Sequence, residues 1–209
     1  MKIFDLSTTI SSKTFVYPTD PEVNVEQVCD LGDSPYAVKR LTLGTHSGTH
    51  VDVPRHAVAG GASCDKLPIG AFIGRMLVVD APCRPGALLD FEDGVIESLG
   101  DDKIICFSTG WEKHAGTKAF FENFPGISPE LAKKLIVAGV KAVATDLPSV
   151  DNPLSSPQTH MLLLDNGIVI IEALINLRAL IGLRPTLYAV PLAIEDGDGS
   201  PVRAFATLD

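Results

Sequence analysis

The sequence has no run of lysine or arginine and no apolar run long enough to cross a membrane. Together with a formal net charge of -9, this argues against nucleic acid or an anionic membrane surface as a partner, because both carry negative charge. The first residues also lack the long apolar core and cleavage site of a signal peptide. These absences favour a cytoplasmic protein that acts on a small molecule.

Cysteine pairs at metal-binding or redox spacing are also missing. Cys29, Cys64, Cys83 and Cys106 are far apart, and in the cytoplasm they should stay reduced. Cys106 lies in an apolar run and is expected to be a small buried side chain. Cys64 lies close to a histidine-rich segment, so it is either a ligand or nucleophile there or an inert thiol.

The remaining composition is that of an ordinary globular chain. At 209 residues, with 45% hydrophobic and 21% charged residues, one domain over 1–209 is expected, and no repeat or low-complexity linker divides it. Strand and helix signals alternate, which indicates an α/β fold but not its topology. Apolar runs bounded by turn residues predict buried strands at 75–80, 103–109, 141–146, 167–172 and 186–192.

One helix is well marked between two of these strands. Ser128 is a good N-cap, Pro129 suits the first helical position, and Leu131 and Leu135 recur on one face until Gly139 can end the helix. The first third of the chain is richer in proline, glycine and alternating apolar residues, which predicts hairpins and loops.

Residues 46–56 hold three of the five histidines and a carboxylate. Gly48 and Pro54 disfavour a helix, so the segment is expected to be extended or to be an extended loop. In an extended chain alternate side chains share a face, and this set falls on even positions: His46, His50, Asp52 and His56.

Imidazole nitrogens and carboxylate oxygens are the usual ligands of a hydrolytic zinc or manganese ion. Three ligands from one short segment are easily preorganised, and the fourth residue is then available for proton transfer. The alternative is a polar loop whose histidines form local hydrogen bonds. The in-phase pattern favours a metal site or a catalytic face.

The pattern His-x-Gly-Thr-His-x-Asp-x-Pro-x-His resembles the signature of the metal-dependent cyclase family, which includes the bacterial kynurenine formamidases. Weaker matches follow in the family's order at 4–7, 16–20, 146–151 and 200–204, so the resemblance covers almost the whole chain. It implies an α/β fold, a single domain with a mixed sheet or barrel-like β core and outer helices.

His160 and Glu172 are polar groups beside apolar runs in the second half of the chain. A buried carboxylate is costly unless it is paired or metal-bound. From the residues alone, Glu172 is equally well a paired or metal-bound carboxylate or an ordinary one, either the first charge after a buried strand or the first acid of a helix through 173–177. The resemblance implies that both residues are metal ligands.

The resemblance also implies an activity, the hydrolysis of N-formylkynurenine to kynurenine and formate in tryptophan breakdown by a metal-bound hydroxide. A divalent metal, zinc or manganese, would occupy two sites per chain, with His56 outside them as the general acid and base. The implied ligands are His46, His50 and Asp52 for one ion, and Asp52, His160 and Glu172 for the other. A homo-oligomer, dimer or tetramer, with sites near subunit contacts is implied as well.

Tyr17 lies where the formamidases often have a tryptophan against the substrate, and Thr19 lies where they usually have glycine. This departure leaves other substrates open, such as a cyclic amide or lactone like isatin. A non-catalytic metal-binding protein of the same fold is the more distant alternative. The intact His56 argues against it, because a pure binding site needs no free proton carrier.

Four further residues have weaker signals. Trp111 either lines an aromatic pocket or belongs to the core, and His114 is expected to be exposed. Asp146 and Asp151 either orient a ligand histidine or cap the turn around Pro148.

Overall fold

A nine-stranded mixed sheet organises the protein, whose computed structural model describes residues 1–208 apart from the side chain of residue 93. Four central strands, β5, β7, β9 and β10, are parallel, and the pairs on either side of them are antiparallel. In sheet order the strands are β1 (Lys2–Asp5), β13 (Phe205–Leu208), β11 (Thr186–Tyr188), β5 (Ile73–Asp80), β7 (Ile104–Ser108), β9 (Ala142–Thr145), β10 (Val169–Glu172), β4 (His50–Asp52) and β12 (Gly199–Pro201). The expected α/β fold with a mixed sheet is therefore confirmed.

The central strands are mostly apolar, as expected where both faces of a sheet are covered. Alternate side chains enter two cores. Leu77, Ile105, Val143 and Ile170 pack in one core with helix residues such as Leu131 and Leu163. Their chain neighbours pack in the other, and include Met76, Ile104, Ala144 and Ile171.

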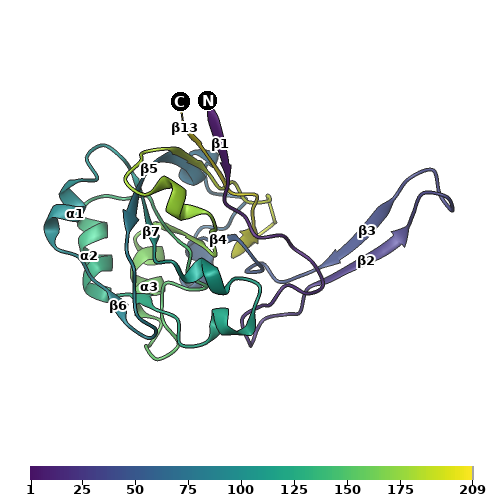
Figure 1. The fold of residues 1–209 in the computed structure, drawn as a ribbon, viewed down its shortest axis with the longest axis horizontal. Helices are drawn as coiled ribbons and strands as arrows, with labels where there is room; N and C mark the ends of the chain where they lie inside the picture. Colours follow the sequence, from purple (N-terminus) through teal and green to yellow (C-terminus); the bar gives the residue numbers. More distant parts are fainter. Residues whose placement is uncertain (209) are drawn as a thin grey trace.

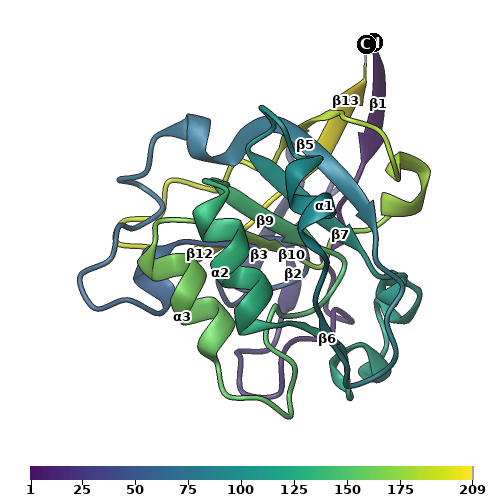
Figure 2. The ribbon, with the colours of Figure 1, turned by 90° about the vertical axis from the view of Figure 1, so that its left-hand side faces the viewer.

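Helices α1 (Asp93–Glu97), α2 (Pro129–Val137) and α3 (Gln158–Asp165) lie on one face of the sheet (Figure 2). Helix α2 begins as predicted, since Oγ of Ser128 accepts the backbone N–H of Leu131 at 3.0 Å. It ends at the predicted place, where Gly139 has a φ of 70°. The short 3-10 helices are η1 (Pro54–His56), η2 (Ile69–Phe72), η3 (Trp111–His114), η4 (Lys118–Phe121) and η5 (Leu177–Leu180). The pair β6 (Leu88–Leu89) and β8 (Gly126–Ile127) forms a small separate sheet.

A hairpin of β2 (Asn24–Cys29) and β3 (Val38–Thr42) extends far from the body of the molecule (Figure 1). All of β3 and most of β2 are exposed. The hairpin expected in the first third of the chain is therefore present, but it packs on neither core.

The five predicted strands all exist, with different ends. Strand β5 begins two residues earlier than the predicted 75–80, at Ile73, and β11 ends at Tyr188 rather than at residue 192. Pro191 cannot donate to a ladder, which is consistent with the earlier end. No helix within residues 1–208 is long and apolar enough to span a membrane.

The backbone decides between local alternatives that the sequence left open at two places. Residues 46–56 are not one extended segment, because Gly48 turns with a φ of 65° and Pro54 starts a 3-10 helix, which leaves only β4 as strand. No helix follows Glu172 directly. Ala173 turns the chain with a φ of 55°, and its N–H donates to the Leu147 carbonyl at 2.8 Å.

Candidate metal centre and active site

Two neighbouring strands bring the buried polar residues of the site together. His50 and Asp52 share one face of β4, and Glu172 ends β10 directly opposite His50 in the antiparallel register. Side chains in such opposed positions lie close together. All three are almost fully buried, with 4%, 1% and 2% exposure. The alternative in which Glu172 is only the first charge after a strand does not account for this burial among histidines.

His46 reaches the same place from the turn before β4. On the other side of β4, Gly199 of β12 pairs with Asp52. A Cβ atom on Gly199 would lie 2.6 Å from Cε1 of His46, so glycine leaves the space that the imidazole fills. The histidine set thus converges despite the broken strand, because a turn redirects His46 toward Asp52.

His160 is in the first turn of α3, and Asp151 fixes its orientation. The Asp151 carboxylate accepts the backbone N–H groups of Thr159 and His160 at 2.9 and 3.0 Å, and it lies 2.7 Å from Nδ1 of the His160 ring. No side-chain cap comes from Pro157 at the N-cap position, so Asp151 supplies it. The interpretation of Asp151 as a partner of a site histidine is therefore confirmed.

Each of the three least exposed histidines of the cluster, His46, His50 and His160, has one ring nitrogen against an outer oxygen. His50 Nδ1 lies 2.9 Å from the Gly48 carbonyl, His160 Nδ1 lies against Asp151, and His46 Nε2 lies 3.1 Å from Oδ2 of Asp198. The other nitrogen of each ring faces the central carboxylates. This is the usual arrangement of metal-binding histidines, whose second nitrogen is held by an oxygen.

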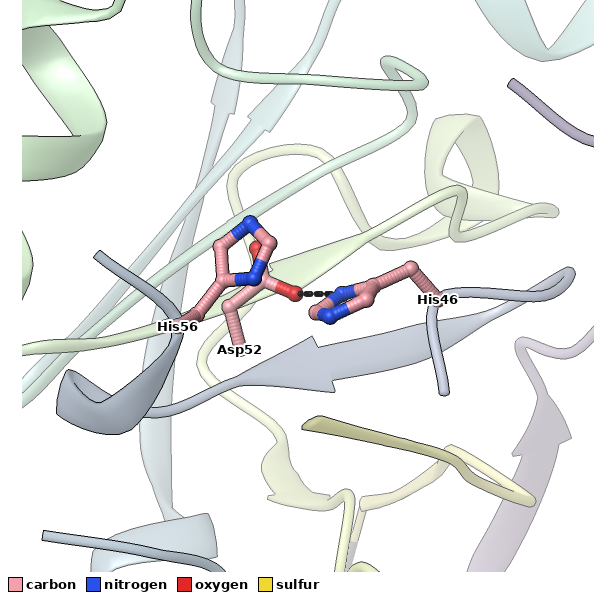
Figure 3. Close-up of side chains that lie close together, drawn as sticks. All are labelled: His46, Asp52 and His56. Carbon is pink, nitrogen blue, oxygen red and sulfur yellow. Dashed lines mark hydrogen bonds and ion pairs between the residues drawn. The ribbon is translucent and has the colours of Figure 1, made fainter. Parts of the chain in front are cut away.

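Asp52 is the centre of these inner contacts. Its Oδ1 lies 2.6 Å from His46 Nδ1 (Figure 3). The same oxygen lies 3.3 Å from His50 Nε2, and Oδ2 lies 3.4 Å from His160 Nε2. Oδ2 is buried and makes no hydrogen bond. A buried carboxylate oxygen without a donor is costly, so it indicates a place for a cation.

The cluster holds two sets of potential ligand atoms, and within each set all the atoms lie within 4.8 Å of one another. One set comes from His50, Asp52 and Glu172, and the other from His46, Asp52 and His56. His160 Nε2 is also 3.4 Å from Oε1 of Glu172. The structure thus brings together the five residues that the family resemblance implied as ligands, and it also brings His56 close to two of them.

The electrostatics of the cluster favour positive charge. Burial opposes protonation of His46, but hydrogen bonds and charges from Asp52 and Asp198 raise its pKa to about 9. The pKa values of His50 and His160 are raised by neighbouring carboxylates in the same way, against the effect of burial. The carboxylates therefore attract a cation, whether a proton or a metal ion.

His56, in η1, is the most accessible histidine of the cluster, with a side chain 34% exposed. Its ring centroid lies 4.1 Å from that of His46, and its Nδ1 lies 3.6 Å from Oδ2 of Asp198. Burial is the main cause that lowers its pKa. Figure 3 shows the His46 ring directed at the Asp52 carboxylate, with the His56 ring beside them.

A cavity of about 730 Å³ opens onto this cluster. Its wall contains the aromatic side chains of Phe15, Tyr17, Phe120 and Phe121, and the Tyr17 and Phe121 rings meet edge to face at 6.0 Å. Among the described residues that line it, Lys13 is the only lysine or arginine. Tyr17 therefore borders the cavity, as its candidate role requires.

The other singled-out residues lie away from this cluster. Trp111 belongs to the core, where its indole N–H donates to the Phe120 carbonyl at 2.9 Å, and His114 packs on it at 4.6 Å rather than being exposed. Asp146 accepts the backbone N–H of Thr109 at 2.9 Å, so it orders the loop after β7 and caps no turn at Pro148.

Cys64 has the properties of an inert thiol. It is 5% exposed, and burial is the main cause that raises its pKa to about 11. Within residues 1–208 it belongs to neither set of potential ligands. Asp198, in contrast, is a site residue that the sequence interpretation missed. Its only local signal is a position between two glycines, Gly197 and Gly199.

Comparison with known proteins agrees with this geometry. Residues 4–152 match the family described as putative cyclase. The kynurenine formamidase of Salinibacter ruber is 35% identical over 208 residues, which cover 98% of this chain and 96% of that protein. The kynurenine formamidase of Erythrobacter litoralis is 33% identical, with 98% and 93% covered.

Solved structures share the fold. An isatin hydrolase bound to the product analogue thioisatinate matches with a TM-score of 0.87 and 25% identity, covering 98% of this chain and 91% of that one. Isatin hydrolase A from Labrenzia aggregata, bound to benzyl benzoate, matches with a TM-score of 0.84 and 24% identity, covering 98% and 93%. Since the family match spans well over half of the chain and the relatives match nearly all of it, this protein is a member of the cyclase family.

Proposed function

We propose that this protein is a metal-dependent amide hydrolase that cleaves N-formylkynurenine to kynurenine and formate. The observation that carries the proposal is the position of the His–Asp–Glu cluster, which opens onto a cavity with an aromatic wall. Such a cavity suits an aryl amide, whose ring contacts aromatic side chains while its amide group lies at the cluster. The similarity to two kynurenine formamidases supports the same substrate.

The residues fit a divalent metal, zinc or manganese. We assign His46, His50 and Asp52 to one ion and Asp52, His160 and Glu172 to a second. The hydrogen-bond-free Oδ2 of Asp52 and the inward-facing ring nitrogens support this assignment. When bound, such ions polarise an amide carbonyl and lower the pKa of water. Asp52 and Glu172 hold the negative charge that retains the ions.

His56 is the proposed proton carrier. Hydrolysis joins a water oxygen to the formyl carbon and breaks the bond between that carbon and the aniline nitrogen. The water loses a proton and the leaving nitrogen gains one. His56 borders the cavity and keeps an exposed edge, so its ring can accept the first proton and donate the second.

The wall of the cavity supports a substrate with a charged tail. Lys13 offers an ammonium group to a carboxylate, and Asp20, also in the wall, offers a carboxylate to an amine. N-formylkynurenine has both groups on its amino-acid tail, whereas isatin has neither. Tyr17 keeps an aromatic face for the aryl ring, although its contact area is smaller than that of tryptophan.

A cyclic aryl amide is the second candidate substrate. It is favoured by the structural likeness to the isatin hydrolase with bound thioisatinate, which extends over 98% of this chain. Both substrates need attack on an amide carbon beside an aryl ring. The difference between them lies in the wall of the cavity rather than in the metal centre.

A homo-oligomer, dimer or tetramer, is also proposed. The β2–β3 hairpin exposes apolar side chains while it contacts neither core, and an isolated hairpin has little stability of its own. A second copy of the chain that covers the hairpin removes both difficulties. Light scattering that finds only a monomer would contradict this. A cytoplasmic location stays a prediction.

The test is a substrate panel with the metal-loaded enzyme, made of N-formylkynurenine, formanilide, isatin and a simple lactone. We expect N-formylkynurenine to have the highest kcat/KM and a chelator to abolish turnover, with recovery on adding metal. Turnover of isatin or the lactone, with neither formamide hydrolysed, would contradict the proposal that N-formylkynurenine is the substrate.

Variants of the cavity wall sharpen this test. Lys13→Ala should raise KM for N-formylkynurenine by about 3- to 10-fold and leave formanilide unchanged, because formanilide has no tail. Tyr17→Trp should improve the hydrolysis of both formamides, and Tyr17→Ala should weaken their binding. Ser12→Ala, next to Lys13 but outside the cavity lining, is the matched control.

A further inference from the structure

Backbone contacts on both sides of Asp198 hold it against the chain around Asp52. Its carbonyl accepts the N–H of Val53 at 3.2 Å, and the carbonyl of Gly197 accepts the N–H of Cys64 at 2.9 Å. On its other side, Gly199 pairs with Asp52 in the sheet. The backbone around Asp198 is therefore fixed relative to the residues that form the site.

Its side chain meets two imidazole rings at once. Oδ2 lies 3.1 Å from Nε2 of His46 and 3.6 Å from Nδ1 of His56, and the two rings are 4.1 Å apart between centroids. The Thr45 side chain also helps to lower the pKa of this carboxylate, after His46. A single carboxylate oxygen thus lies beside an assigned metal ligand and the assigned proton carrier.

The contacts select one arrangement of protons on each ring. A carboxylate accepts hydrogen bonds, and His46 faces one with each ring nitrogen, Asp52 with Nδ1 and Asp198 with Nε2. When a metal ion takes the place of the proton on Nδ1, Asp198 keeps the N–H at Nε2 and leaves the Nδ1 lone pair to the metal. For His56 it favours N–H at Nδ1 and leaves Nε2 with the lone pair that accepts a proton. Both outcomes are those that the proposed function requires.

We infer that Asp198 is a positioning residue that holds His46 for metal binding and His56 for proton transfer. The inference rests on the proposed function, and it adds a residue that links the two roles. Loss of the carboxylate frees both rings together, so metal affinity and turnover should change in the same variant. The Asp198 side chain is 41% exposed. If it were only a solvated surface group, its loss would change neither metal affinity nor turnover.

The neighbouring Asp196 provides a matched control in the same loop. It is exposed and has a φ of 50°, a conformation that asparagine tolerates well. Asp196→Asn and Asp198→Asn therefore remove the same charge, two residues apart. Only the second change affects an oxygen beside the histidines.

The experiment measures zinc affinity by competition with a chelator, together with kcat and KM for N-formylkynurenine at saturating zinc. We expect Asp198→Ala to weaken zinc binding by about 10- to 100-fold, the usual cost of losing the outer partner of a ligand histidine. Asp198→Ala should lower kcat by a larger factor than it changes KM, because His56 acts in the reaction and not in substrate binding. Asp196→Asn should match wild type.

Asp198→Asn is the rescue variant, since its amide oxygen still accepts an imidazole N–H. It should recover most of the zinc affinity and part of kcat, and thermal unfolding of each variant identifies any that fail to fold. Wild-type zinc affinity and kcat in a folded Asp198→Ala would overturn the inference. If wild type hydrolyses no amide, the proposed function fails, while the zinc measurement still tests the inference at His46.

Discussion

Asp52 and Asp146 are both buried carboxylates at the central sheet, yet their surroundings differ. Asp146 follows β9 and receives three donors, the N–H and hydroxyl of Thr109 at 2.9 and 2.7 Å and the N–H of Glu112 at 3.3 Å. Asp52 faces imidazole rings, and its Oδ2 receives no hydrogen bond. Asp52 is 1% exposed and Asp146 is 0% exposed, so burial alone does not distinguish them.

The donors distinguish them. Backbone N–H groups hold their protons permanently, so the oxygens of Asp146 are satisfied and the residue orders a loop. An imidazole nitrogen can lose its proton and bind a metal ion instead, so the oxygens of Asp52 are available to a cation. The pKa values differ too. Burial raises the pKa of Asp146, whereas at Asp52 the neighbouring imidazoles of His50, His160 and His46 prevail over burial and hold the pKa well below its usual range.

The largest expected effect is at Asp52. Asp52→Ala should remove at least one metal ion per chain and reduce turnover by about 10³-fold or more, because the carboxylate contacts both groups of assigned ligands. His46→Ala and His50→Ala should also lose metal. Elemental analysis of the purified proteins measures this, and equal metal in wild type and all three variants would contradict the metal centre.

The second largest effect is expected at His56, where a variant tests whether every residue close to Asp52 is a metal ligand. His56→Ala should keep its metal and lose about 10²- to 10⁴-fold in kcat, the range for removal of a general acid and base. Metal content and kcat are measured on the same sample. If metal and activity disappear together, His56 is a ligand, as its closeness to His46 and Asp52 would permit.

The smallest effect on activity is expected at Asp146. Asp146→Asn replaces an acceptor with an NH₂ group that opposes an N–H donor, which should lower the free energy of unfolding by about 1–3 kcal/mol. Metal content should equal that of wild type, and kcat of the folded enzyme should stay within about two-fold. Denaturant unfolding measures the first quantity. Asp165→Asn, at an exposed aspartate of α3, is the control. Loss of metal in Asp146→Asn would break the distinction between the two carboxylates.

The sequence predicted the parts of the structure that depend on local pattern. The strands around residues 75–80 and 141–146 follow from apolar runs, and α2 follows from Ser128, whose hydroxyl caps it as expected. The histidine signature identified the cluster because its spacing is local. Its backbone was predicted less well, since a glycine turn and a 3-10 helix, rather than one strand, direct His46 and His56 inward.

Long-range pairing explains what the sequence did not predict. Asp198 and His46 are 152 positions apart, and they meet because β12 pairs with β4. The turn at Ala173 is equally non-local. Alanine favours a helix, but the Ala173 carbonyl accepts the hydroxyl of Thr49 at 2.7 Å and its N–H donates to Leu147, which fixes a left-handed turn.

The pairing of β12 with β4 also sets an order of events during synthesis. Protein chains are made from the amino terminus, so His46, His50 and Asp52 exist long before Gly199 and Asp198 do. Strand β13, which joins β1 to the sheet, comes later still. Contacts between such distant segments form slowly because a long loop must close first. The complete centre therefore assembles only when the last strands are in place, and a nascent chain holds its histidines without the partners that orient them.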